Sequence, residues 1–249
     1  MTATPLDVVA WASRWRTRSV AEKVVLCGGL MMCALLLPPW PTTVIVMTTV
    51  CTAARHAGVP ILHLQRMLRV PGLFILVAGL STAFTPNSSW PPLTTSGSAL
   101  LAAGATVARS FAATAAMLLF ASTTPMSDLT NALRRVGLPA ACVDVITVMY
   151  RMVFLLLESL TVVRRSQTGR LGYSNARRSL RSAGLLIAAV LTRAWQRAYA
   201  LERGLSGREV GATSAKPDKR PVSTRFIFGA TLTNTMVIAL SLASHVVVR

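Results

Sequence analysis

The chain has 249 residues, of which 53% are hydrophobic and only 14% are charged, and its formal net charge is +18. Soluble domains carry about a quarter charged residues, so this composition excludes an ordinary soluble domain and indicates an all-α membrane protein with several spans. A strong positive charge also suggests nucleic acid as a partner. Here the basic segments are separated by apolar runs and hold few aromatic side chains for base stacking, which argues against nucleic-acid binding.

The first half of the chain predicts four membrane spans. Residues 1–23 form a basic N-terminal segment, and residues 24–122 form a four-span bundle with apolar runs at 24–37, 42–54, 70–84 and 99–122. The segments 1–23, 55–69 and 123–141 are basic, whereas 38–41 and 85–98 carry no charge. Because cytoplasmic segments are enriched in Lys and Arg, the N-terminus is expected in the cytoplasm and 85–98 outside.

Arg109 is the one charged residue of the fourth apolar run. Three roles are open for it: its side chain can extend to the membrane surface, pair with another helix, or mark a functional polar site.

A short helix is expected after the bundle. Ser127 or Asp128 can cap its start, Arg134 and Arg135 form its basic end, and Gly137 with Pro139 ends it.

Residues 140–163 are apolar but contain Asp144, Arg151 and Glu158 at intervals of seven, which suits one helix face. Three charges in lipid are costly, so we expect a helix buried in protein with its charges paired. The final span is 226–249, after a polar cytoplasmic linker at 209–225. The chain has five membrane spans if 140–163 stays on the cytoplasmic side and six if it crosses, and the pattern leaves both open.

Residues 164–208 combine a basic amphipathic helix with two motifs that each place an arginine beside a glycine. The first motif is residues 169–173, with Arg170 and Gly172, and the second is residues 202–204, with Arg203 and Gly204. Each is expected at a helix end, where glycine can take the left-handed conformation. Between them an apolar stripe recurs every three or four residues, formed by Leu180, Ala183, Ile187, Leu191, Ala194, Ala198 and Leu201. A supporting basic face is expected from Arg177, Arg178, Arg181, Arg193 and Arg197. A helix of this kind can also simply lie on anionic lipid.

The sequence holds no recognisable catalytic or nucleotide-binding chemistry. Residues 211–216 lack the second glycine of a phosphate-binding loop, and Pro217 stands where that loop needs Ser or Thr. His56 and His63 have no third ligand near them in sequence, so a metal site is not expected. The cysteines form no paired motif, and reduced, buried thiols are expected. The chain is therefore expected to be a non-catalytic subunit without a cofactor.

Residues 167–173, 177–182 and 200–205, together with 133–139 and 150–151, resemble the transmembrane (T) subunit of energy-coupling factor transporters, and the first motif is most similar to the cobalt-transport branch. The resemblance covers about residues 125–210 and makes residues 123–208 a cytoplasmic-side coupling-helix module. It departs from the family at Gly169 and Glu202, where alanine is usual.

The resemblance implies a multi-pass subunit of the plasma membrane. Two cytoplasmic ABC ATPase subunits would dock on the two motifs, through Arg170 and Arg203, and a separate substrate-binding membrane (S) subunit would carry cobalt or nickel. A T subunit for vitamin uptake, and a basic membrane anchor without a transport role, are the alternatives.

Overall fold

The structure is a computed structural model that describes residues 5–86, 93–94, 97–206 and 223–247. These residues are helical except for turns and one pair of two-residue antiparallel strands, β1 (Thr85–Pro86) and β2 (Leu93–Thr94). They form two compact units. The bundle comprises residues 5–129 and 219–249, and the hairpin unit comprises residues 130–218.

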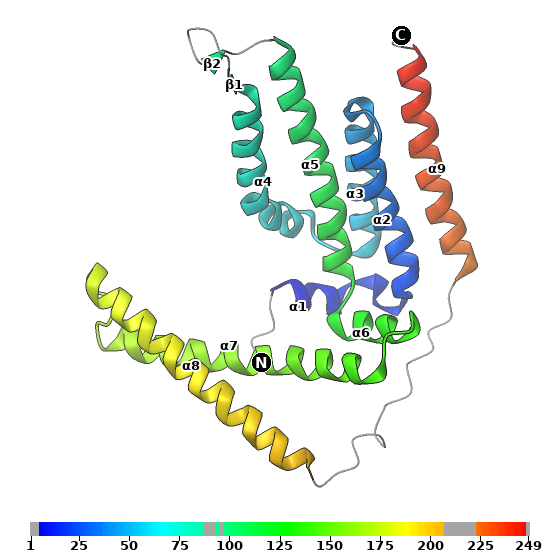
Figure 1. The fold of residues 1–249 in the computed structure, drawn as a ribbon. Helices are drawn as coiled ribbons and strands as arrows, with labels where there is room; N and C mark the ends of the chain where they lie inside the picture. Colours follow the sequence, from blue (N-terminus) through cyan, green and yellow to red (C-terminus); the bar gives the residue numbers. More distant parts are fainter. Residues whose placement is uncertain (1–4, 87–92, 95–96, 207–222, 248–249) are drawn as a thin grey trace. The chain divides into compact units, whose positions relative to one another are not determined.

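The bundle is built around α5 (Gly97–Thr123), which packs against α1, α2, α3 and α4, while α9 packs against α2 and α3 (Figure 1). Its apolar core includes Leu30, Val46, Val50 and Leu119, which have no exposed surface. The other helices of the bundle are, in chain order, α1 (Pro5–Ala12), the 3-10 helix η1 (Arg14–Thr17), α2 (Val20–Leu36), α3 (Pro39–Ala57), α4 (Ile61–Ala83) and α9 (Thr224–Val247).

Local signals explain several helix ends. Ser19 caps α2 because its hydroxyl accepts a hydrogen bond from the backbone N–H of Glu22. Gly58 ends α3 in the left-handed conformation, with φ of 73°, which a glycine adopts without steric cost.

Four described helices are long and apolar enough to cross a membrane, and they confirm an all-α polytopic membrane protein. They are residues 61–83, 99–123, 140–169 and 224–243. The bundle helices α2 and α3, with 17 and 19 residues, are not among these four. The number of membrane crossings, five or six, therefore stays a prediction.

The third apolar run, 70–84, is part of a longer helix. Residues 61–69 of the basic segment 55–69 form the first turns of α4, which continues through Pro71 to Ala83. Proline lacks the N–H of the helical ladder and its ring clashes with the preceding turn. The helix accordingly bends within its length (Figure 1).

Arg109 of α5 pairs with another helix, as one of the three open roles supposed. Its Nη2 donates to the backbone carbonyl of Leu37, at a distance of 3.1 Å. Leu37 is the C-cap of α2, where the helix dipole favours a cation.

The hairpin unit consists of the end of α6 (Met126–Arg135), α7 (Ala140–Gly169) and α8 (Ala176–Leu205). Gly137 has φ of 99° and follows α6, as expected for a helix stop. The helix α6 begins at Met126, so Ser127 and Asp128 lie in its first turn and do not precede it. Most of the expected linker, residues 209–225, lies outside the described residues.

The expectation that residues 140–163 are buried in this chain is wrong. Only Val143 and Ser159 of α7 are buried. The prediction of paired charges is confirmed for Asp144, which forms an ion pair with Arg134 at the end of α6. Arg151 and Glu158 are exposed, and within the described part of the chain no ion pair involves them. The apolar surface of α7 has to be shielded from water by lipid or protein, and the described residues of this chain leave most of it exposed.

The cysteines are free thiols. Cys27 and Cys33 are buried as expected, whereas Cys142, at the start of α7, is exposed.

Candidate functional site

The first glycine-arginine motif forms the turn between α7 and α8. Arg170 is the C-cap of α7, and Leu171 follows with φ of 56°. The backbone N–H groups of Arg170 and Gly172 both donate to the carbonyl of Gln167, at 3.2 and 2.9 Å. The predicted helix end is thus confirmed, but the left-handed residue is Leu171 and not a glycine. Leu171 is 70% exposed, and its left-handed conformation carries the intrinsic steric cost that a Cβ atom imposes there.

Gly172 is required here because two chain segments meet at it. A Cβ atom on this residue would lie 2.7 Å from Oγ of Ser182 and 2.9 Å from the carbonyl oxygen of Gln167. The Ser182 hydroxyl donates to the Gly172 carbonyl at 2.9 Å. The first turns of α8 are thereby fastened to the turn itself.

Gln167 completes a small polar cluster that locks the turn. Its Nε2 donates to the carbonyl of Ser182 at 3.1 Å, and its Oε1 accepts from the hydroxyl of Tyr173 at 2.8 Å. Sequence reasoning assigned no individual role to Gln167, Tyr173 or Ser182. The signal available was that all three lie in the segments 167–173 and 177–182 that carry the family resemblance, but no periodic pattern links positions 15 residues apart.

This cluster leaves Arg170 facing outward. Its side chain is exposed, and no hydrogen bond or ion pair to another described residue involves it. Arg170 is thus held at the backbone by the turn, while its guanidinium is available for a bidentate contact with a carboxylate.

The second motif lies inside the last turn of α8 and not beyond it. The helix continues to Leu205, so Gly204 is helical, and nothing lies within 4 Å of the position its Cβ would take. The expected left-handed glycine is therefore wrong here as well. Arg203 is exposed, and its Nε donates to the carbonyl of Tyr199 at 3.4 Å. Glu202 is exposed beside it, but neighbouring residues on a helix point in different directions.

The two predicted docking arginines lie near opposite ends of α8. This helix has 30 residues, which corresponds to about 45 Å at 1.5 Å per residue. Arg170 and Arg203 are therefore not parts of one compact site. They are two separate cationic points, one in the turn before α8 and one in its last turn.

The supporting arginines lie off the apolar stripe, as the 3.6-residue helical period requires. Arg197 is half-buried, and its Nη1 has no partner among the described residues. Arg178 donates to the hydroxyl of Ser174 at 3.1 Å. The others, Arg177, Arg181 and Arg193, are exposed.

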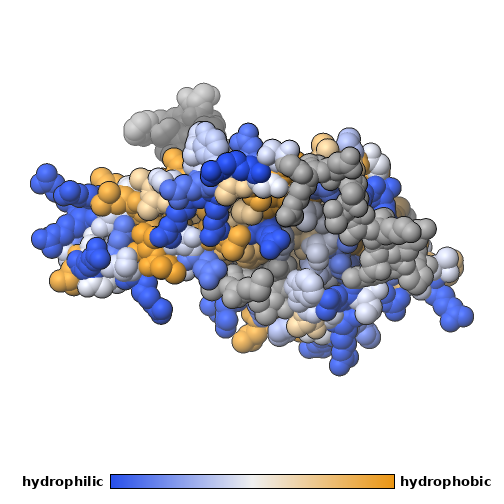
Figure 2. All heavy atoms as spheres, turned by 90° about the horizontal axis from the view of Figure 1, so that it is seen from below, coloured by the Kyte–Doolittle hydropathy of each residue, from blue (hydrophilic) through white to orange (hydrophobic). Residues whose placement is uncertain are grey.

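The apolar stripe of α8 is present but uncovered by the described chain. Leu180 is 78% exposed and Ile187 is 68% exposed. Figure 2 shows hydrophilic and hydrophobic side chains interleaved toward its left edge, the side on which the α7–α8 turn lies in Figure 1. A surface of this kind suits a partner that is both acidic and apolar, or the surface of a membrane.

Within the part of the chain that the structure describes, no group of three or more His, Cys, Asp and Glu side chains is placed to hold a metal ion. Residues 211–216, whose glycine-lysine spacing was considered above, lie outside the described residues.

Comparison with known proteins identifies the family. Residues 12–210 match the model of the CbiQ family, described as cobalt transport protein. The cobalt transport protein CbiQ of Rhodobacter capsulatus is 33% identical over 94% of this chain and 95% of its own length. That of Salmonella typhimurium is 26% identical over 78% of this chain and 91% of its own length. With its apolar spanning helices and its match over most of its length, the chain belongs to the CbiQ family and is a membrane component of cobalt transport.

Proposed function

We propose that this chain is the transmembrane coupling subunit of an energy-coupling factor importer for cobalt. Two cytoplasmic ABC ATPases would dock through Arg170, in the turn between α7 and α8, and Arg203, in the last turn of α8, and a separate substrate-binding membrane subunit would deliver the ion. The protein would lie in the plasma membrane with its N-terminus in the cytoplasm, because the segments on that side are rich in arginine.

The observation that supports this most is the pair of exposed arginines without acidic partners, Arg170 in the turn before α8 and Arg203 in its last turn. Residues 130–206 contain twelve arginines and three acidic residues, and the one ion pair among them joins Arg134 to Asp144. The remaining positive charge favours acidic partners. Two contact points separated by about 40 Å of helix suit two partner molecules better than one.

The geometry suggests how movement would pass through the chain. The Gln167–Ser182 and Ser182–Gly172 bonds fasten α8 to the end of α7. A displacement of either ATPase that pulls on Arg170 or Arg203 would therefore move a connected pair of helices. Such movement would alter the interface with the substrate-binding subunit and release cobalt inward.

Cobalt is preferred over nickel or a vitamin as cargo because both relatives named above are called cobalt transport proteins. In this proposal cobalt is the cargo and not a resident cofactor.

The test compares two arginines of the same helix. Arg203→Ala and Arg178→Ala each remove one positive charge, and both side chains are exposed. Tagged variants are expressed together with the ATPases and the substrate-binding subunit and isolated in mild detergent, and ATPase recovery and cellular cobalt uptake are measured. A specific coupler loses both with Arg203→Ala and keeps both with Arg178→Ala.

A basic membrane anchor without a transport role predicts a different outcome. Its binding depends on total charge, at about 1 kcal/mol for each basic residue near the surface, so the two variants would be equally weakened. Equal effects, or no ATPase with the wild-type chain, would reject the coupling proposal.

A further inference from the structure

The hairpin unit is continuous with the bundle at two places. One connection leaves α5 at Thr123 and passes through α6, and the other enters α9 at Thr224. Two neighbouring residues of α2, Glu22 and Lys23, bind the bundle side of these connections. Both side chains are fully buried. Among the described residues, no other charged side chain is fully buried.

Lys23 holds the first connection. Its Nζ donates to the backbone carbonyl of Thr123 at 2.7 Å. Thr123 is the last residue of α5, where the exposed carbonyl groups and the helix dipole attract a cation. Ser122 and Thr123 are themselves buried, so the contact is shielded from water.

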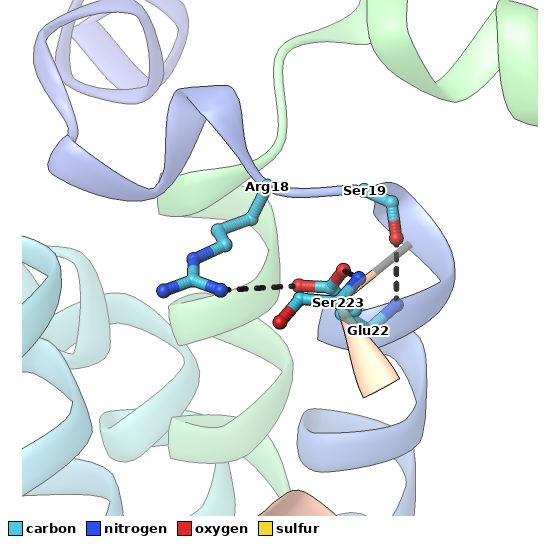
Figure 3. Close-up of polar contacts among 4 residues, drawn as sticks. All are labelled: Arg18, Ser19, Glu22 and Ser223. Carbon is cyan, nitrogen blue, oxygen red and sulfur yellow. Dashed lines mark hydrogen bonds and ion pairs between the residues drawn. The ribbon is translucent and has the colours of Figure 1, made fainter. Parts of the chain in front are cut away.

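Glu22 holds the second connection. Its Oε1 accepts from the backbone N–H of Ser223 at 2.7 Å, and its Oε2 lies 3.9 Å from Nη1 of Arg18 (Figure 3). The carbonyl of Ser223 accepts from the N–H groups of Phe226 and Ile227. Glu22 therefore places a carboxylate at the N-terminus of α9, where the helix dipole favours negative charge.

Aromatic contacts hold the same end of α9. The guanidinium of Arg18 lies over the ring of Phe226, with its Cζ 4.9 Å from the ring centroid. Trp15 of η1 meets Phe226 edge-on, with centroids 5.5 Å apart. The start of α9 is thus fixed by a carboxylate, a cation and an indole ring.

We infer that Glu22 and Lys23 act together as an anchor that fixes both chain connections of the hairpin unit to α2. Burying two charges is costly, and apolar side chains would hold α2 against α5 and α9 without that cost. Lys23 binds the last residue of α5, before the hairpin unit, and Glu22 binds the residue before the start of α9, after the hairpin unit. Movement that reaches Thr123 or Ser223 is then passed to α5 and α9 as whole helices and is not absorbed by unwinding of their ends. The inference rests on the proposed coupling function, and both residues are positioning residues.

The test measures cobalt taken up for each ATP hydrolysed. Glu22→Gln removes the charge but keeps an oxygen that can accept from Ser223, and Lys23→Met removes the donor to Thr123. Arg66→Gln is the control, because Arg66 is an exposed cation on α4 of the same unit. Each variant is assembled with the ATPases and the substrate-binding subunit in liposomes.

Both anchor variants are expected to retain the ATPases and to hydrolyse ATP, with several-fold less cobalt taken up for each ATP, while the control matches wild type. A merely structural role would lower the yield of complex and leave this ratio unchanged. If the ratio is unchanged in the variants while the wild-type chain binds the ATPases, the anchor inference is overturned and the proposed function is not. Absence of ATPase on the wild-type chain overturns the proposed function and the anchor together.

Hydrogen exchange on the wild-type complex gives a second test that does not depend on how the variants fold. The anchor requires the N–H groups of Ser223 and the last turn of α5 to stay protected when ATP is bound and when ADP is bound. Rapid exchange at either place in one nucleotide state would overturn the inference.

Discussion

The bundle and the hairpin unit differ in where their side chains find partners. The bundle has a buried apolar core, and its buried Glu22 and Lys23 are bonded within the unit. In the hairpin unit α7 buries two residues and α8 buries one, Ser182.

This contrast indicates two kinds of sequence constraint. In the bundle a residue is fixed by its neighbours in the same chain, so volume and hydrogen bonding decide what is tolerated. In the hairpin unit most side chains contribute little to the stability of this chain alone. In the proposed coupling role their identity matters for binding, and α8 combines exposed leucines with exposed arginines.

The largest effect is expected from placing a bulky side chain where two bundle helices pack closely together. Val107 of α5 occupies the place where a Cβ on Gly79 of α4 would stand, and small residues permit such close helix packing in membranes. Gly79→Leu is expected to destabilise the bundle by about 3 kcal/mol through overpacking. The measurement is the midpoint of unfolding by SDS in mixed micelles.

Gly104→Leu is the matched control, since nothing lies within 4 Å of the position of its Cβ. A similar loss of stability in both variants would contradict the packing of α4 on α5.

A smaller effect, confined to the hairpin unit, is expected from Gly172→Ala. The added methyl group meets Ser182 and the carbonyl of Gln167, so the turn should be destabilised by about 2 kcal/mol. Hydrogen exchange in residues 167–182 should accelerate, and ATPase recovery should fall. Gly169→Ala, where no atom obstructs a Cβ, should leave both unchanged, and a loss there would place the constraint elsewhere.

Removing the Arg109 side chain should have a still smaller effect. Arg109→Gln loses the charged hydrogen bond to the carbonyl of Leu37, which is worth about 1.5 kcal/mol. SDS unfolding should detect the difference, with Arg66→Gln as the control for loss of an exposed charge. If Arg109→Gln lowers cobalt uptake without lowering stability, Arg109 has a functional role that this contact does not explain.

The smallest effect is expected from Asp144→Asn at the junction of α6 and α7. The carboxylate is 44% exposed and pairs with Arg134, and exposed ion pairs contribute less than about 1 kcal/mol. Hydrogen exchange of residues 134–144 should increase slightly at low salt, and the difference should vanish at high salt. A large, salt-independent change would show that the junction depends on more than this pair.

Sequence reasoning succeeded where one residue type dominates a long stretch. The apolar runs predicted the all-α membrane architecture, and the basic residues of 164–208 predicted exposed arginines on α8. It failed where the decision depends on distant contacts. The apolar run at 70–84 did not show that the helix starts nine residues earlier, where Arg66 and Arg69 lie within the first turns of α4.

The predicted site shows the same division. The locations of Arg170 and Arg203 near helix ends follow from local sequence, whereas the role of Gly172 depends on Ser182, ten residues away. The pairing of Glu22 with Ser223 spans 201 residues, and no periodicity can indicate it. The docking role of the arginines stays a prediction.

The burial of Lys23 decides where an amine-reactive label can attach. The sequence contains three lysines, Lys23, Lys216 and Lys219, and every other basic side chain apart from the histidines is arginine. With Lys23 enclosed, the other lysine targets of a fluorescent ester, Lys216 and Lys219, follow α8 in the sequence. The arginines of α8 do not react with such a reagent, so labelling leaves the proposed docking residues chemically unmodified.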